Sequence, residues 1–229
     1  MAPPWPDGRG PGGPLSSASP AQALPESAPE PIESRVLRVM TERGRPGFIA
    51  ENHFWSALFG LVFWDVMFLP VPRAFGHPFQ DRPTDLFSAE FRPAREAQVV
   101  ARLAALATEP DWRDRVLDVY RRKAGIANAM IAWETVPLPW LERALAVLPA
   151  AHVAAILDRL SWNPGGFRTG FPDLFLFVPE SPGYLLAEVK SPNDRLQNNQ
   201  KNWMRFFERH GIPFRLLQVE YAAAHDSSA

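Results

Sequence analysis

Two short apolar runs separated by a turn constrain the fold of this chain more than any other feature. The first run, 170–177, contains Asp173 followed by Leu-Phe-Leu-Phe, and the second, 184–190, reads Tyr-Leu-Leu-Ala-Glu-Val-Lys. Both runs are rich in residues that favour strands. The segment 178–183 between them holds two prolines and ends in glycine, which is typical of a turn. The pattern therefore predicts a β-hairpin.

The predicted hairpin brings charged side chains together. With the turn at its centre, Asp173 lies opposite Glu188 or its neighbour, and opposed side chains are roughly 5 Å apart. Glu188 and Lys190 are two residues apart and share a face of the strand. Two carboxylates among apolar residues lose hydration free energy unless something compensates. A hard divalent cation such as Mg²⁺ binds carboxylate oxygens and leaves room for a substrate phosphate, which points to metal-assisted phosphodiester chemistry. An ordinary ion pair between Glu188 and Lys190 on an exposed strand is the alternative.

A helix and a third strand are expected after the hairpin. The helix runs from Asn193 or Asp194, as its N-cap, to Gly211, as its stop, and so includes Leu196. Its apolar residues recur at the spacing of a buried helix face, and a second stripe carries cations at every fourth position, namely Lys201, Arg205 and Arg209. The third strand is Phe214–Tyr221. The unit therefore reads strand, strand, helix, strand.

The residues around this hairpin resemble a known family. The segments that carry the resemblance are Gly170-Phe171-Pro172-Asp173-Leu174 and Glu188-Val189-Lys190-Ser191-Pro192-Asn193-Asp194-Arg195-Leu196. They are similar to the VRR-NUC domain of the PD-(D/E)XK nuclease superfamily, and most similar to its Fanconi-associated nuclease branch. The resemblance implies an α/β fold of the restriction-endonuclease type, with a small mixed β-sheet flanked by helices and preceded by a helical region.

The same resemblance implies roles for individual residues. Asp173 and Glu188 would be metal ligands, the Val189 carbonyl a further ligand, and Lys190 the catalytic lysine. Gln200 matches a helix glutamine that lies near the active site in related enzymes. The metal would be Mg²⁺ or Mn²⁺.

The resemblance extends upstream to Glu51. The stretch Leu58-Phe59-Gly60-Leu61-Val62-Phe63-Trp64-Asp65 looks like the family's apolar L-x-G-L-x-x-W-D segment, which follows a glutamate-bearing helix. The family's remaining acidic ligand therefore maps onto Glu51, in the first turn of a helix over 54–69. This apolar run is shorter than the roughly 20 residues of a membrane helix, and Asp65 interrupts it, so we expect a buried core helix. Asp65 either lies past the buried part or pairs with an arginine.

Composition separates a tail from the folded part of the chain. Residues 1–33 are dominated by Pro, Gly, Ser and Ala, which predicts disorder. We expect a helical region carrying Glu51 over 34–160, with helices at 94–106, 113–123, 141–148 and 151–160, and a nuclease core over 161–223. The chain has no cysteine, which excludes disulfides and zinc–cysteine sites, and its net charge of −1 confines any DNA-binding surface to a local patch. Candidate DNA contacts are Arg168, Arg195, Gln200 and Lys201.

The function implied by the resemblance is a DNA nuclease. Its substrates would be 5′-flap or branched DNA, its reaction endonucleolytic or 5′-exonucleolytic, and its setting interstrand-crosslink repair, in the cytoplasm of a prokaryote or the nucleus of a eukaryote. No membrane is expected as a partner. A phage- or restriction-type nuclease of the same fold is one alternative. A non-catalytic DNA-binding scaffold is another.

Overall fold

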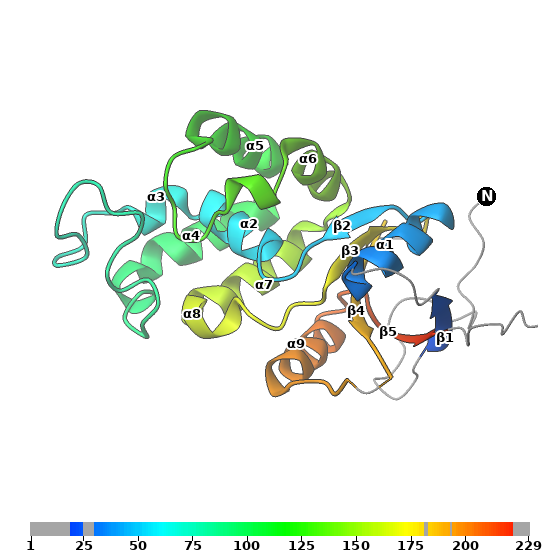
Figure 1. The fold of residues 1–229 in the computed structure, drawn as a ribbon. Coiled ribbons are helices and arrows are strands. Elements are labelled where there is room, and N and C mark those ends of the chain that lie inside the picture. The colour runs from blue at the N-terminus through cyan, green and yellow to red at the C-terminus, as the bar shows by residue number, and fades with distance from the viewer. Residues whose placement is uncertain (1–18, 25–29, 181–182, 193, 222–229) are drawn as a thin grey trace, which may run out of the picture. The chain divides into compact units, whose positions relative to one another are not determined.

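The computed structural model describes residues 19–24, 30–180, 183–192 and 194–221. The chain divides into two compact units, one formed by 1–51 together with 171–229 and the other by 52–170 (Figure 1). This division differs from the boundaries expected from the sequence, because residues 34–51 belong to the unit that holds the sheet. We call the two the sheet unit and the helical unit.

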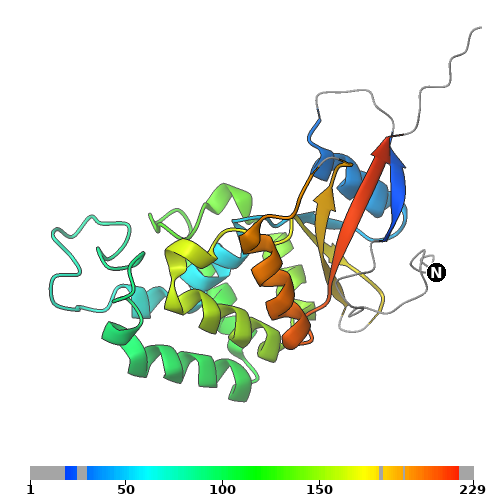
Figure 2. The same cartoon turned by 90° about the horizontal axis from the view of Figure 1, so that it is seen from below.

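The sheet unit is built on a five-stranded mixed sheet in the order β1-β5-β4-β3-β2 (Figure 2). The strands are β1 (Ser19–Leu24), β2 (Gly47–Ile49), β3 (Leu174–Phe177), β4 (Tyr184–Lys190) and β5 (Phe214–Tyr221). β2, β3 and β4 pair antiparallel, whereas β5 is parallel to both β4 and β1. The predicted hairpin and third strand are confirmed. A parallel pair needs a crossover, and the helix α9 (Asn198–Arg209) supplies it between β4 and β5.

The two faces of the sheet carry different cores. Helix α1 (Ile32–Glu42) packs Val36 and Met40 into an aliphatic cluster with alternate residues of β3 and β4, including Leu174 and Ala187. Because side chains alternate along a strand, Asp173 and Glu188 point to the opposite face. Phe171, in the segment that leads into β3, stacks on Trp203 of α9 with ring centroids 4.1 Å apart.

The prediction that residues 1–33 are disordered is wrong for the part of this segment that the structure describes. Residues 1–18 and 25–29 lie outside the described residues, but 19–24 form strand β1 and α1 begins at Ile32. The backbone of β1 pairs with the edge of β5. Hydrogen bonds of a sheet ladder do not depend on large apolar side chains, which is why composition alone did not predict this strand.

The start of α9 also differs from the expectation. Asn193 lies outside the described residues, and the N-cap is Gln197 rather than Asp194. Gln197 and Gln200 form a capping box, while the Asp194 carboxylate accepts the Ser191 hydroxyl at 2.6 Å. The predicted stop is confirmed, since Gly211 follows the C-cap with a φ of 64°.

The helical unit is organised around the buried helix α2 (Phe54–Val62), every residue of which is buried. The elements that follow are α3 (Trp64–Met67), η1 (Pro93–Arg95), α4 (Glu96–Thr108), α5 (Trp112–Lys123), η2 (Trp133–Thr135), α6 (Leu138–Val147), α7 (Ala150–Trp162) and α8 (Pro164–Phe167). The core helix expected over 54–69 is observed as two helices, α2 and α3, and the four helices expected at 94–106, 113–123, 141–148 and 151–160 are confirmed. α2 packs on α5 and α7, and α4 packs on α7.

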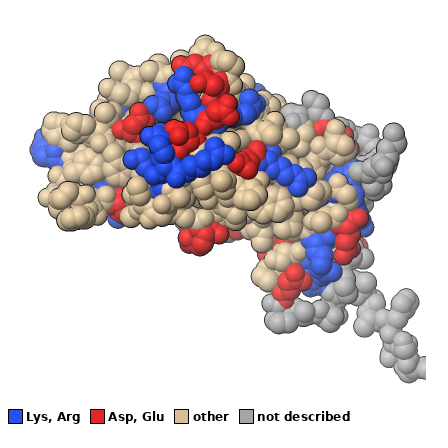
Figure 3. Space-filling view, turned by 90° about the horizontal axis from the view of Figure 1, so that it is seen from above, with Lys and Arg blue, Asp and Glu red and all other residues tan. Residues whose placement is uncertain are grey.

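Charges in the helical unit are largely paired. Asp65 pairs with Arg102 at 2.6 Å, which confirms the expectation that it pairs with an arginine. Arg95 is buried and pairs with Asp85 at 2.7 Å. Arg121 pairs with Glu142 at 2.8 Å. The face in Figure 3 shows cations and acids interleaved rather than a patch of one sign.

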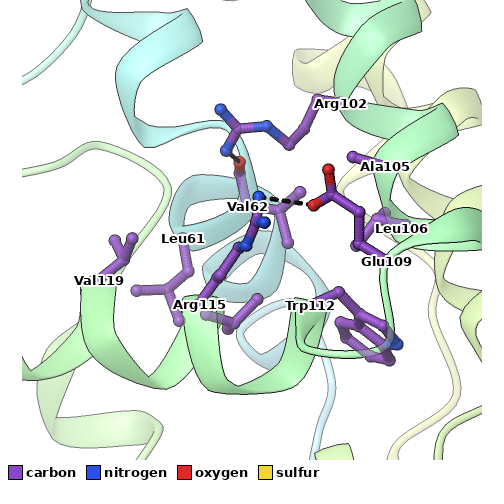
Figure 4. A pocket seen from close by; sticks show the side chains of 10 residues that line it. Leu61, Val62, Arg102, Ala105, Leu106, Glu109, Trp112, Arg115 and Val119 are labelled. Carbon is purple, nitrogen blue, oxygen red and sulfur yellow. Dashed lines mark hydrogen bonds and ion pairs between the residues drawn. The ribbon is translucent and has the colours of Figure 1, made fainter.

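A small, partly open pocket between α2, α4 and α5 is lined by Arg102, Glu109 and Arg115 together with apolar side chains (Figure 4). Its volume of about 50 Å³ is far below the roughly 300 Å³ of the smallest usual ligand pockets. Over the described residues, no single helix is long and apolar enough to cross a membrane; α6 and α7 pass that test only as a pair, bent by 114°.

Candidate active site

The hairpin register places the two carboxylates opposite each other. β3 and β4 pair Leu174 with Ala187, so the next position along sets Asp173 against Glu188. The Val189 backbone N–H donates to Asp173 Oδ2 at 2.7 Å. Both acids are buried, with Asp173 7% exposed and Glu188 1% exposed. The predicted register of the hairpin is therefore confirmed, and the pair is not an exposed strand feature.

Lys190 and Gln200 both engage one oxygen of Glu188. Lys190 Nζ lies 2.9 Å from Glu188 Oε1, and Gln200 Nε2 donates to the same oxygen at 2.5 Å. The other oxygen, Glu188 Oε2, is buried and has no hydrogen-bond partner among the described residues. One oxygen is thus held by protein donors, while a second buried acceptor is left for something else.

Glu51 reaches this patch from a turn rather than from a helix. It lies between β2 and α2, and α2 begins only at Phe54. The N–H groups of Ala50 and Glu51 donate to the Asp173 carbonyl at 2.7 and 3.3 Å. Asn52 has a φ of 59°, a left-handed conformation that interrupts helical backbone before α2 starts. The expected first-turn position is therefore wrong, although Glu51 does lie beside Asp173.

Burial and neighbouring negative charges raise the pKa of both carboxyl groups. Desolvation is the largest cause for Asp173, whose pKa rises to about 6, and the Glu51 charge adds to it against the Val189 hydrogen bond. Desolvation again dominates for Glu188, whose pKa rises to about 8, with the Asp173 charge next and Lys190 opposing. The protein alone does not supply enough positive charge to keep both groups ionised at neutral pH.

These features fit a divalent cation. Among the described residues, no group of three or more Asp, Glu, His or Cys side chains is arranged so that it could hold a metal ion. The unpartnered Glu188 Oε2 and two carboxyls with raised pKa values are nevertheless what a cation would satisfy, since it favours their charged forms. Hard oxygen donors without cysteine or histidine suit Mg²⁺ or Mn²⁺.

The raised pKa values predict how stability depends on pH without metal. Each group binds its proton more tightly in the folded than in the unfolded chain, so its contribution to stability is complete below about pH 4 and is lost as the pH rises through about 6 for Asp173 and about 8 for Glu188. In EDTA, the melting temperature of the wild type should fall more between pH 5 and 8.5 than that of an Asp173→Asn, Glu188→Gln variant. Added Mg²⁺ should stabilise the wild type most at pH 8.5. Parallel pH profiles for the two proteins would contradict this expectation.

Gln200 offers a second test within the site. Its Oε1 accepts the Gln197 N–H at 2.9 Å while its Nε2 donates to Glu188, so one side chain both caps α9 and holds the carboxylate. Gln200→Leu should lower stability by about 1 kcal/mol through the lost cap and lower metal-dependent cleavage by roughly 10- to 100-fold. Denaturation and cleavage of the same preparations measure the two effects. Asn202→Leu, at an exposed position of the same helix, is the control, and loss of stability with unchanged cleavage would leave Gln200 only a capping role.

The other predicted contacts are not brought to this patch by any described interaction. Arg168 belongs to the helical unit, where its guanidinium lies 4.7 Å from the Phe87 ring centroid. Arg195 and Lys201 are exposed in the sheet unit, before α9 and in its first turn. Contact of Arg168, Arg195 and Lys201 with DNA therefore stays a prediction.

One acidic residue was missed by reasoning from the sequence. Glu33, in the first turn of α1, raises the pKa of Asp173 through its charge. It was hidden because composition assigned it to the tail. The amphipathic spacing of 32–42, with an acid in its first turn, was the signal available.

Comparisons with known proteins agree with this geometry. Residues 108–221 match the VRR-NUC domain. The chain is 38% identical over 195 residues to a Fanconi-associated nuclease 1 homolog of Pseudomonas aeruginosa, covering 85% of this chain and 35% of that protein. It is 31% identical to Fanconi-associated nuclease 1 of Danio rerio over 182 residues, covering 78% of this chain and 18% of that protein.

A solved structure gives the same result for the fold. The crystal structure of paFAN1 bound to a 2-nucleotide 5′-flap DNA with a gap superposes with a TM-score of 0.81 at 36% identity, covering 91% of this chain and 39% of that one. The expected restriction-endonuclease-like α/β class is thereby confirmed. The chain spans about a third or less of the length of the curated relatives named here.

Proposed function

Because the chain belongs to the VRR-NUC family, we propose that it is a metal-dependent nuclease that hydrolyses phosphodiester bonds in DNA. The observation that carries this proposal is the asymmetry of Glu188. Lys190 and Gln200 hold its Oε1, and its buried Oε2 is unpartnered beside Asp173. An inert scaffold gains nothing from a buried carboxylate in this state, since desolvation without compensation is destabilising.

Each residue of the patch has a role in the proposal. Glu51, Asp173, Glu188 and the Val189 carbonyl would hold Mg²⁺ or Mn²⁺. A bound ion of this kind supplies a Lewis acid for a phosphoryl oxygen and lowers the pKa of water. Lys190, whose ammonium group lies 2.9 Å from Glu188 Oε1, would hold a phosphate oxygen or orient the attacking water. Gln200 fixes the Glu188 carboxylate.

The preferred substrate is proposed from the relatives. A related structure contains 5′-flap DNA with a gap, and related proteins are named Fanconi-associated nucleases. We therefore propose that this chain cuts 5′-flap or branched DNA, as an endonuclease or a 5′-exonuclease, in DNA repair that includes interstrand crosslinks. Arg168, Arg195 and Lys201 are proposed to contact the DNA backbone. Such a protein acts where the DNA is, in the cytoplasm of a prokaryote or the nucleus of a eukaryote.

A substrate panel tests the proposal. Labelled single-stranded, duplex, 5′-flap and 3′-flap DNA are incubated with the protein and Mg²⁺, Mn²⁺ or EDTA. We expect cleavage of the 5′-flap with either metal and none in EDTA. Equal cutting of plain linear duplex would favour a restriction-type nuclease of the same fold. Tight binding to flaps without cutting in either metal would favour a scaffold.

A further inference from the structure

The most exposed large apolar side chain of the described residues is Phe79, in the loop that joins α3 to η1. It is 89% exposed, whereas the next, Trp162, is 53% exposed. Single apolar residues on a surface are common and need no explanation. Almost complete exposure of a phenyl ring on an ordered turn is different, because both faces of the ring remain available to a flat partner.

The turn that carries Phe79 is held by its own hydrogen bonds. The Gln80 Oε1 accepts the backbone N–H groups of Gly76 and His77, the latter at 3.0 Å. The Phe79 N–H donates to His77 Nδ1 at 3.2 Å. At the base of the loop, the Thr84 N–H donates to the Ala74 carbonyl at 2.8 Å. The ring is therefore presented on a preorganised turn, which lowers the entropy lost when a ligand binds.

The surroundings of Phe79 favour a nucleic acid over an apolar surface. Phe79 lines an open hollow of about 480 Å³ with polar and charged neighbours that include Gln80, Arg82 and Thr84. Arg82 is half-exposed, so its guanidinium can reach a phosphate, although it also pairs with Asp81 at 3.3 Å. A second hollow of about 480 Å³ shares His77 and Gln80 and adds Lys123. Aromatic rings flanked by cations are the usual elements of sites for unpaired nucleotides.

We propose that Phe79 is a stacking platform for an unpaired nucleobase of the DNA substrate. This inference rests on the proposed nuclease function and adds a residue that selects DNA with unpaired bases beside the duplex. Stacking on an aromatic ring does not depend on which base is present, so the contact would favour structure over sequence. The described contacts of Phe79 give it no part in the core, so its substitution should leave the fold intact.

Fluorescence of 2-aminopurine tests the proposal. The analogue is placed in turn at each unpaired position of a gapped 5′-flap substrate, and the protein is titrated in EDTA so that the substrate stays intact. For the wild type we expect quenching at one or more positions. Phe79→Ala should remove it and weaken binding by at least about fivefold, Phe79→Trp should retain both, and Phe79→Leu should lose the quenching.

Controls separate the possible outcomes. Val100→Ala removes an apolar side chain that is 48% exposed on α4, and it should match the wild type. Melting temperatures should be equal for all variants. If the wild type cuts flaps with Mg²⁺ but Phe79→Ala binds and quenches as the wild type does, the stacking role is wrong and the nuclease function stands. The stacking role is also wrong if Phe79→Ala binds DNA as the wild type does but loses self-association or binding to another protein. If the wild type neither cuts nor binds flaps, the proposed function fails first.

Discussion

Asp173→Asn should reduce metal-dependent cleavage of 5′-flap DNA by at least about 10³-fold while leaving the fold intact. The variant keeps an acceptor for the Val189 N–H, which Asp173 Oδ2 binds at 2.7 Å, and removes only the negative charge. Loss of a charged ligand weakens binding of the metal ion and reduces its stabilisation of the reacting phosphate by several kcal/mol. Each 1.4 kcal/mol is a factor of ten in rate. Single-turnover cleavage with excess enzyme measures it.

The stability of the same variant should move in the opposite direction. Because burial raises the pKa of Asp173, the ionised carboxylate is unfavourable in the metal-free protein at pH 8, and asparagine avoids that cost. Asp173→Asn should therefore melt at the same or a higher temperature in EDTA, and Mg²⁺ should no longer stabilise it. Glu220→Gln, an exposed position on β5, should behave as the wild type in both assays. A variant that is unfolded, or that cuts within tenfold of the wild type, would contradict the assignment.

Lys190→Met should reduce cleavage by roughly 10²- to 10⁴-fold. The substitution removes the ammonium group 2.9 Å from Glu188 Oε1. The lysine also lowers the pKa of Glu188, so its loss should raise that pKa further and weaken Mg²⁺ binding near neutral pH. Metal binding should recover as the pH is raised to 9, but cleavage should not, because the group that orients the water or the phosphate is gone.

Calorimetric titration with Mn²⁺ at pH 7.5 and 9, beside cleavage at saturating metal, separates these two effects of Lys190. Arg209→Met, an exposed cation in the last turn of α9, is the matched control and should leave both unchanged. Full recovery of cleavage at pH 9 would assign Lys190 only an electrostatic role on Glu188.

The hairpin shows how far local patterns determine this fold. Two apolar runs and a turn of prolines and glycine were enough to give the strands and the pairing of Asp173 with Glu188. The helix α9 and β5 followed from the same kind of pattern. These features are predictable because they depend on neighbours in sequence.

The remainder depends on contacts between distant segments. Glu51 is beside Asp173 because β2 pairs with β3, and no spacing in the sequence predicts that pairing. Strand β1 pairs with the edge of β5, which is distant in sequence. Local composition carries no sign of that partner and therefore predicted disorder for this segment. The N-cap of α9 moved to Gln197 because Gln200 completes a capping box there. The unpartnered oxygen of Glu188 likewise emerges only from the packed structure.

A direct measurement of Mn²⁺ binding tests whether Asp173 and Glu188 hold the divalent cation that cleavage requires. Free and bound Mn²⁺ are distinguished by electron paramagnetic resonance as the metal-free protein is titrated at pH 7.5, for the wild type and for the Asp173→Asn, Glu188→Gln variant. We predict that the wild type binds one or two ions over the concentration range that supports flap cleavage, and that the double variant binds none there. Equal binding by the two proteins, or cleavage by the wild type at concentrations where it binds no ion, would contradict the account.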